Sequence, residues 1–394
     1  MTYPTILPKL TLDFANSRQL DPRITFSRSS SATYLHPDTG LITTAPSDVA
    51  RFEEQGLLIE EARTNLLTYS EEFDNAVWGQ NDCTVTPDVA AAPDGTSTAD
   101  KLVAANTNAA HYLVSSASVT ATSHTVSVYG KSAEKEWLTL NVYNGSTYLK
   151  FSFNVSAGEI GIVPAGGSSA IQPLANGWYK CTATYTSAVA GNNSIHIHVY
   201  DDASTEIWQG NGVDGLYIWG AQVEEGSFPT SYIPTAGATA TRAADITLMT
   251  GTNLSSWFNP NSGTIFTIAS CFAPTYSAAN RFVWYFTNPG LKQHNARANG
   301  FQFYDSGYGS GNQYVVPYVT NIPNKAVYSF ETNNTTSAIN GSLASLSTSW
   351  SPTDHTLLSI GSNNGTNLFL NGHISRFAYY PVRLPDEQLQ ALTA

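Results

Sequence analysis

Acidic residues are the first candidates for chemistry in this sequence, because sugar hydrolysis needs two carboxylates held about 5–10 Å apart. Glu134 and Glu136 share one face of a predicted strand, but Lys135 stands between them at a turn. The acids of the C-terminal part are few and far apart in the chain. A solvated strand face explains Glu134 and Glu136 better than catalysis, and no serine-hydrolase elbow, phosphate loop or metalloprotease motif is present. We therefore expect no enzyme activity.

A His-x-His pair is the second candidate. His196 and His198 alternate with three aliphatic residues, so both imidazoles point away from the core side of one strand. Such a pair can bind a metal ion if a third ligand is near. Asp201 and Asp202 follow at the strand end, but no further histidine lies close in the sequence. We favour two polar residues on an exposed or ligand-facing sheet surface over a metal site.

Aromatic residues in polar segments are the third candidate. Trp208 lies in residues 206–212, a Gly-rich polar stretch in which no strand pattern predicts its burial. Residues 304–314 combine Tyr, Gly, Ser and Asn, a composition typical of adaptable recognition loops. Subunit contacts explain such loops equally well. Trp137 and Tyr148 are intermediate between core and surface residues.

Cysteine chemistry is not expected. Cys83, Cys181 and Cys271 are too few and too scattered for a disulfide framework or a zinc cluster. We predict three free, buried thiols.

The charge balance limits the kinds of partner. The chain of 394 residues has 18 Lys and Arg against 30 Asp and Glu, a net charge of −12. Residues 70–235 hold 5 of these basic residues and 16 of the acidic ones. Since Lys and Arg do not cluster, we expect no nucleic-acid partner. No apolar run approaches the roughly 20 residues of a membrane span, and the first residues lack a signal-peptide pattern, so we expect neither membrane insertion nor secretion by such a signal.

Strands must position these residues. Apolar and polar residues alternate in several runs separated by turn residues such as Asn144-Gly145. The clearest runs are residues 125–129, 138–143, 149–155, 195–199 and 215–219. A second series lies between residues 263 and 379, and the one convincing helix covers residues 385–392. We predict an all-β chain with two antiparallel β-sandwich (jelly-roll) domains in tandem.

Composition divides the chain into three segments. Residues 1–69 hold five prolines and short apolar pieces, so we predict an extended N-terminal arm that packs against a larger body or a neighbouring subunit. Residues 70–235 form the first sandwich and residues 236–394 the second. A Pro-, Gly- and Thr-rich linker is predicted at residues 230–239.

Several stretches resemble parts of a known protein family. Residues 26–34 (FSRSSSATY) and 56–67 (GLLIEEARTNLL) resemble the N-terminal module of fibre and spike proteins of tailed phages. Residues 69–224 are similar to the carbohydrate-binding-module-like jelly roll that follows it there. Residues 372–385 look like the closing strand and terminal helix of a concanavalin-A/laminin-G-like lectin domain.

The resemblance implies a non-enzymatic phage virion protein, a fibre, spike or decoration component that binds host-surface glycans. It further implies contacts with other virion proteins through the N-terminal arm, and a homotrimer. Trp178 and Trp219 match core positions of the resembled jelly roll. Glu72 and Asp74, together with Glu71, lie where related jelly rolls often hold a structural calcium ion, which suits an acid-rich domain better than zinc does. Three solvated acids near the start of a strand are the alternative, which we slightly favour. The carbohydrate-binding residues would be Trp208, Tyr304, Tyr308, Asn312 and Tyr314.

Two other functions stay open. A capsid decoration or cement subunit would use its aromatic loops to contact neighbouring subunits instead of sugars. A polysaccharide depolymerase has only fold analogy in its favour.

Overall fold

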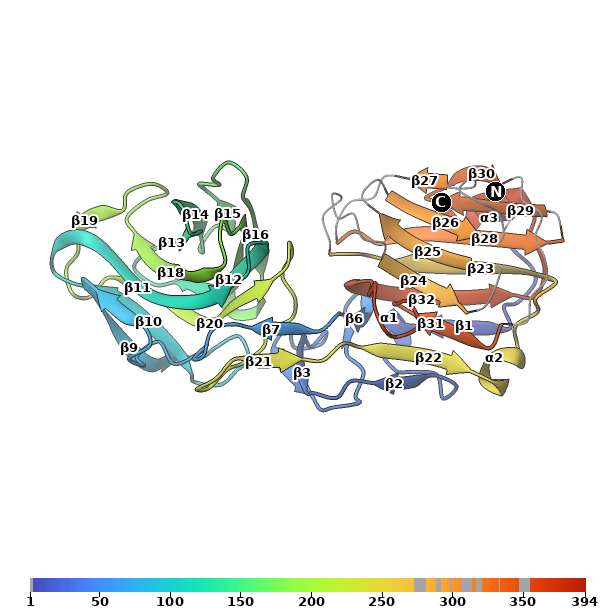
Figure 1. Ribbon diagram of the computed structural model, residues 1–394, viewed down its shortest axis with the longest axis horizontal. Helices are drawn as coiled ribbons and strands as arrows, with labels where there is room; N and C mark the ends of the chain where they lie inside the picture. The colour runs from blue at the N-terminus through green and yellow to red at the C-terminus, as the bar shows by residue number, and fades with distance from the viewer. Residues whose placement is uncertain are drawn as a thin grey trace. The chain divides into compact units, whose positions relative to one another are not determined.

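The structure is a computed structural model that describes residues 3–272, 281–287, 292–297, 300–305, 314–316, 321–332, 334–346 and 355–394. For residues 292–297, 300–305, 314–316 and 344–346 it describes the backbone. The chain divides into two compact units. Unit 1 comprises Met1–Ser31, Ala45–Ala62 and Ala243–Ala394, and unit 2 comprises Ala32–Thr44 and Arg63–Arg242. Antiparallel strands dominate both units (Figure 1), which confirms the predicted all-β class.

Unit 2 contains two large antiparallel sheets. The first has the strand order β16 (Ser168–Pro173), β17 (Tyr179–Thr186), β12 (Ser123–Ser132), β20 (Gly215–Glu225), β10 (Ala99–Ala104) and β9 (Cys83–Ala90). The second, here called the His sheet, has the order β15 (Glu159–Ile160), β14 (Tyr148–Asn154), β13 (Trp137–Tyr143), β18 (Gly191–Tyr200), β11 (Asn108–Val119) and β19 (Ile207–Gln209). Strand β8 (Gly79–Asn81) also pairs with β11.

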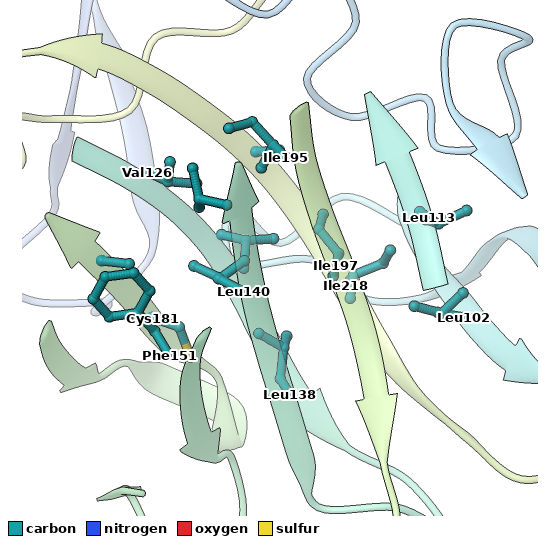
Figure 2. Packing of buried hydrophobic residues seen from close by; sticks show 14 of the residues in the cluster. Leu102, Leu113, Val126, Leu138, Leu140, Phe151, Cys181, Ile195, Ile197 and Ile218 are labelled. Atoms are coloured by element: carbon teal, nitrogen blue, oxygen red, sulfur yellow. The ribbon is translucent and has the colours of Figure 1, made fainter. Parts of the chain in front are cut away.

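The main core of unit 2 lies between these two sheets. Leu138 and Ile197 of the His sheet belong to one buried cluster with Val126 and Ile218 of the other sheet, as Figure 2 shows. These residues come from the alternating runs that predicted strands, and they form strands as expected. Because successive side chains of a strand point to opposite faces, burial of this set directs its neighbours outward.

A predicted turn sets the register at one edge of the His sheet. Asn144-Gly145 joins β13 to β14, and the Asn144 Oδ1 accepts hydrogen bonds from the backbone N–H groups of Ser146 (3.0 Å) and Thr147 (2.9 Å). Gly145 has φ +89°, a left-handed conformation that favours glycine. This turn fixes the pairing of β13 with β14, the two strands that it joins.

Smaller elements complete unit 2. β3 (Ala32–Leu35) pairs with β4 (Ile42–Ala45), β7 (Arg63–Asn65) pairs with β21 (Ala240–Arg242), and η1 (Ala175–Gly177) is a short 3₁₀ turn. Trp178 and Trp219 are buried in a second cluster with Tyr129 and Tyr232, which confirms that both tryptophans are core residues. The three cysteines of the chain are free and buried, as predicted.

Unit 1 contains two further antiparallel sheets. One has the order β30 (Ser342–Leu346), β29 (Asn334–Ile339), β28 (Asn324–Glu331), β23 (Ser262–Ala269), β32 (Gly372–Tyr380), β6 (Gly56–Ile59) and β5 (Phe52–Glu53), with β1 (Leu10–Asp13) also paired to β32. The other has the order β2 (Thr25–Ser27), β22 (Ile246–Thr250), β31 (Leu357–Ile360), β24 (Arg281–Phe286), β25 (Lys292–Arg297), β26 (Gly300–Asp305) and β27 (Tyr314–Val316).

The helices of the described residues are short. α1 (Phe14–Ser17) and α2 (Thr252–Ser255) have four residues each, and the predicted terminal helix is present as α3 (Asp386–Thr393). No described helix has the length and apolar character that a membrane span requires.

The prediction of a separate N-terminal arm over residues 1–69 is wrong. β1 pairs with β32 from Leu10↔Tyr379 onward, β6 pairs with the same strand, and β2 pairs with β22. Leu10, Leu12 and Phe14 are buried. The short apolar pieces of this segment are strands of sheets whose other strands lie far along the chain, so their local pattern does not show the pairing.

The predicted linker and the boundary at residue 236 are also corrected. Tyr232 and Ile233 are buried within unit 2, and the Asn65 side-chain amide donates a hydrogen bond to the Ile233 carbonyl (2.9 Å). The Pro-, Gly- and Thr-rich composition of residues 230–239 marks an irregular segment that is packed, not a free linker. The boundary between the units lies after Arg242.

A buried ion cluster connects three segments of unit 1. Asp245 pairs with Arg28 (3.0 Å) and with Arg51, and Arg51 also pairs with Glu60 (2.8 Å). All four side chains are at most 1% exposed. Burial alone would lower the pKa of Arg51, but the carboxylates of Asp245 and Glu60 outweigh it and raise that pKa. Arg51 therefore stays charged at all ordinary pH values.

Candidate functional site

Polar and aromatic side chains of four neighbouring strands meet on the outer side of the His sheet. Tyr112 of β11 stands opposite His198 of β18, and Thr139 of β13 stands opposite His198 on the other side. In the next row Asn141 stands between His196 and Lys150 of β14. We call this side the His–Tyr face; it comprises Tyr112, Thr139, Asn141, Tyr148, Lys150, His196, His198 and Tyr200.

Aromatic rings pack closely on the His–Tyr face. The ring of Tyr112 is stacked on His196 (centroids 4.8 Å apart, planes at 14°) and on His198 (4.6 Å, 29°). Tyr148 meets His196 edge-on at 5.3 Å, and Tyr200 meets His198 edge-on at 5.5 Å. Tyr148 is 50% exposed, so one aromatic ring of this group is open to solvent.

The same face carries buried polar atoms that have no hydrogen-bond partner among the described residues. They include both ring nitrogens of His198, the Asn141 Oδ1 and the Thr139 Oγ1. His198 is only 1% exposed. Each unpaired buried polar atom costs about 1–3 kcal/mol, so such atoms are rare and call for a physical explanation. Thr139 stands directly opposite His198, and Asn141 lies two residues further along the same strand.

Burial keeps both histidines of the face uncharged. Desolvation, with smaller contributions from His196 and Lys150, lowers the pKa of His198 to about 3. Desolvation also lowers the pKa of His196, although the carboxylate of Glu206 works against it. A neutral imidazole offers one hydrogen-bond donor and one acceptor. At neutral pH the pair therefore suits hydroxyl groups, which both donate and accept.

The two charged groups at the face, Lys150 and Glu206, are paired with each other. The Lys150 ammonium group forms an ion pair with the Glu206 carboxylate. Burial, with the nearby Glu206, raises the pKa of Tyr200, so its phenol stays protonated. The face thus offers flat rings and hydrogen-bonding groups with little net charge.

The prediction for the histidine pair is confirmed in direction and corrected in exposure. Both imidazoles point away from the core, but His196 is 9% and His198 1% exposed because Tyr112 covers them. The part of the chain that the structure describes contains no group of three or more His, Cys, Asp or Glu side chains placed to hold a metal ion. A third protein ligand for a metal at this pair is therefore missing from the described residues.

The prediction that Trp208 is exposed in a polar loop is wrong. Trp208 lies in β19 and is 7% exposed, and its Nε1 donates a hydrogen bond to the Val199 carbonyl (3.2 Å). His111 packs edge-on against its ring at 4.8 Å, and the Lys135 ammonium lies 4.3 Å from the ring centroid. A strand of three residues is too short to show alternation, so the polar neighbours of Trp208 hid its burial.

The predicted recognition loop lies largely outside the described residues. Tyr308 and Asn312 fall outside them. Tyr304 lies in β26 and Tyr314 in β27, adjacent strands of one sheet of unit 1, and only their backbone is described. The carbohydrate-binding role of these four residues stays a prediction.

The predicted calcium residues are on the surface of unit 2. Glu72 and Asp74 are both exposed. Between them, the Phe73 backbone N–H donates a hydrogen bond to Asp100 (3.1 Å), whose pKa burial raises to about 6. Calcium takes about six to eight oxygen ligands, so two exposed carboxylates alone do not form a site. Calcium binding at Glu72 and Asp74 stays a prediction.

Most of the His–Tyr face is absent from the sequence predictions. His196 and His198 are predicted candidates and Tyr148 an intermediate residue, but Tyr112 and Asn141 are not connected with them. The available signal was that alternate residues of four separate strand runs carry Tyr, His, Asn or Thr where the other alternate residues are aliphatic. Strand order, which the sequence does not give, brings these residues together.

Comparisons with known proteins give distant likenesses. No family model matches the chain. No curated protein matches it either. The structure of the Ruminococcus gnavus IT-sialidase CBM40 bound to α2,3-sialyllactose is similar over 34% of this chain and 83% of that one, at 16% identity and a TM-score of 0.29. Trypanosoma rangeli sialidase with sialic acid is similar over 75% of this chain and 60% of that one, at 9% identity and a TM-score of 0.31.

A third solved structure is domains LG4-5 of the mouse laminin α1 chain. It is similar over 83% of this chain and 95% of that one, at 10% identity and a TM-score of 0.25. With TM-scores below 0.5, none of these likenesses carries a conclusion about the ligand or activity of this chain.

Proposed function

We propose that this chain is a glycan-binding protein without catalytic activity, and that the His–Tyr face of unit 2 is its binding surface. One observation carries the proposal: stacked tyrosine and histidine rings share one sheet face with buried polar atoms that have no partner among the described residues. A sugar presents C–H groups to an aromatic ring and hydroxyl groups to neighbouring donors and acceptors. The exposed ring of Tyr148 and the amide of Asn141 offer these two kinds of contact, directly or through water.

Binding is favoured over hydrolysis by the acids of this sheet. Its strands carry one acid, Glu159, in the two-residue edge strand β15. The other carboxylate near the rings, Glu206, is held in an ion pair with Lys150. A glycosidase needs two carboxylates on either side of the scissile bond, one of them able to give up a proton.

We further propose that the protein is a virion component of a tailed phage that presents this surface to host glycans, as a homotrimer. This part rests on the sequence resemblance of residues 26–34 and 56–67 to phage fibre and spike proteins. A trimer would multiply weak single-site affinities. A cement role is the alternative, in which the face would contact a neighbouring subunit.

Binding of the full chain to a glycan array tests the proposal. Tyr148→Ala and Tyr112→Ala are expected to abolish or strongly reduce array signals and adsorption to host cells. Tyr3→Ala is the matched control, because Tyr3 is 65% exposed and lies in unit 1. Binding that survives both substitutions would place the site elsewhere. No binding to any glycan, together with loss of particle stability when the protein is absent, would favour the cement role.

A further inference from the structure

The His–Tyr face holds no uncompensated positive charge. Lys150 is the single Lys or Arg on the strands of the His sheet. Its ammonium group is already paired with Glu206, and the two side chains are 38% and 29% exposed. An anionic ligand would have to displace one carboxylate from Lys150 in order to supply another, which gains little.

The rest of unit 2 adds repulsion for anions. All residues of unit 2 are described, and they include 7 Lys and Arg against 17 Asp and Glu, a net charge of −10. Its two arginines, Arg63 and Arg242, are 9% and 1% exposed. Lys101 and Lys135 are paired with Glu134 (2.7 Å) and Asp201 (2.6 Å). A carboxylated or sulfated ligand therefore approaches a negative body with no free cation at the site.

The hydrogen-bonding groups of the face match uncharged partners instead. Thr139 offers a hydroxyl group, Asn141 an amide oxygen, and His198 two ring nitrogens, and all three are buried. A hydroxyl group can donate to one of these atoms and accept from another. Because these atoms are buried, a ligand hydroxyl group reaches them through a bridging water molecule or after Tyr112 moves aside.

We infer that the His–Tyr face binds neutral glycans and discriminates against glycans that carry carboxylate or sulfate groups. This inference rests on the proposed function and specifies its ligand class. The charge of unit 2 and the Lys150–Glu206 pair carry the discrimination.

Calorimetric titration of the full chain with two panels of oligosaccharides tests the inference. The neutral probes are xylohexaose, cellohexaose, maltohexaose and chitohexaose, together with the neutral hits of the array. The acidic probes are trigalacturonate, sialyllactose and a heparin hexasaccharide. We expect at least one neutral probe to bind, with an affinity that does not depend on salt. Acidic probes should bind about tenfold more weakly or worse. This difference in affinity should shrink at higher salt, because salt screens the repulsion. Acidic probes that bind as tightly as neutral ones overturn the inference and leave the proposed function standing. If no probe binds and the glycan array gives no signal, both the inference and the proposed function are wrong.

Substitution of Glu206 supplies a gain-of-function test. Glu206→Gln frees Lys150 and is expected to improve the affinity for an acidic probe relative to a neutral one by about fivefold, the effect of one exposed ion pair. Glu159→Gln is the matched control, because it removes an exposed acid from the edge of the same sheet without freeing a lysine. If folded Glu206→Gln protein keeps the wild-type ratio of affinities, the Lys150–Glu206 pair does not set the preference and the inference fails.

Discussion

His198 has two ring nitrogens, 1% exposure and no described hydrogen-bond partner for either nitrogen. A buried position of this kind is normally filled by an apolar residue, because an unpaired polar group destabilises the fold. Its neighbours Thr139 and Asn141 show the same pattern on the next strand. At the scale of single residues, unit 2 thus keeps polar atoms where stability alone would favour valine or leucine.

Two aromatic residues separate binding from stability. Tyr148→Ala is expected to reduce glycan binding while leaving the melting temperature nearly unchanged, because Tyr148 is 50% exposed. Trp208→Ala is expected to lower the free energy of unfolding of unit 2 by about 3–5 kcal/mol, because it empties a core position. Chemical denaturation and array binding of both variants check this. A stable Trp208→Ala protein that no longer binds sugar would restore the role that the sequence suggested for Trp208.

The lowered pKa of His198 gives a second prediction, on the pH dependence of stability. Its pKa is about 3 in the folded chain against an ordinary 6.5. Below pH 6.5 the unfolded chain therefore binds a proton at this imidazole, and the folded chain does not. The neutral imidazole's contribution to the unfolding free energy is fully present above pH 6.5. About 2 kcal/mol of it is lost between about pH 7 and pH 5. The difference in unfolding free energy between wild type and His198→Gln should change by this amount over that interval.

The titration of Asp100 changes the unfolding free energy in the opposite direction, so its effect must be measured separately from that of His198. Burial raises its pKa from 3.8 to about 6, so acidification through pH 6 stabilises the folded chain. Urea unfolding of wild type, His198→Gln and Asp100→Asn at both pH values resolves the two contributions. An unchanged difference between wild type and His198→Gln would mean that His198 has the same pKa in the folded and unfolded chains.

At the scale of elements, the sheets of unit 1 depend on strands from both ends of the chain. β1 and β6 both pair with β32, and Leu10, Leu12 and Phe14 fill the core beside them. The N-terminal strands are therefore structural parts of unit 1 and not a detachable arm. Oligomer contacts, if they form, must use surfaces that remain after this pairing.

Deletion of residues 1–13 tests this role. The truncated chain lacks β1 and is expected to lose the unfolding transition of unit 1 or to show it at a much lower temperature, while unit 2 unfolds as in wild type. Differential scanning calorimetry and near-ultraviolet circular dichroism measure both. Deletion of residues 1–8 is the control, because Ile6 and Leu7 are 44% and 83% exposed. Two unchanged transitions after removal of β1 would contradict the structural role.

Strand identity could be predicted from the sequence, and strand order could not. The alternation around Leu138, Leu140 and Val142 is a local property of the chain, so it predicted β13 and its outward residues correctly. The pairing of β1 with β32 joins residues more than 350 positions apart, which no local period shows. The His–Tyr face needs the same non-local information, since Tyr112 and His198 come from different runs.

At the scale of the whole molecule, the two units have different charges. Unit 2 carries nearly all of the net negative charge, −10 of −12, and also the proposed site. A ligand surface inside an acidic body favours uncharged partners over the anionic ones that many surface polysaccharides contain. The exposed acids Glu72 and Asp74 belong to the same body.

Chelation tests whether these acids hold calcium. If they do, removal of calcium should lower the melting temperature of unit 2 alone, because an ion that binds only the folded state stabilises it by mass action. Calorimetry with and without a chelator measures the shift, and the double variant Glu72→Gln, Asp74→Asn should not respond. A melting curve that the chelator leaves unchanged would end the prediction of a structural calcium ion.

The pairing of β1 and β6 with β32 also sets the order in which the chain can fold as it is made. The ribosome releases the stretch Arg63–Arg242, nearly all of unit 2, before the strands of Ala243–Ala394 exist. Until then Arg28 and Arg51 have no Asp245 to pair with, and β1 has no β32 to join. Unit 2 is therefore expected to fold first on the nascent chain. The N-terminal strands stay unpaired, and open to contacts with other chains, until β32 is made.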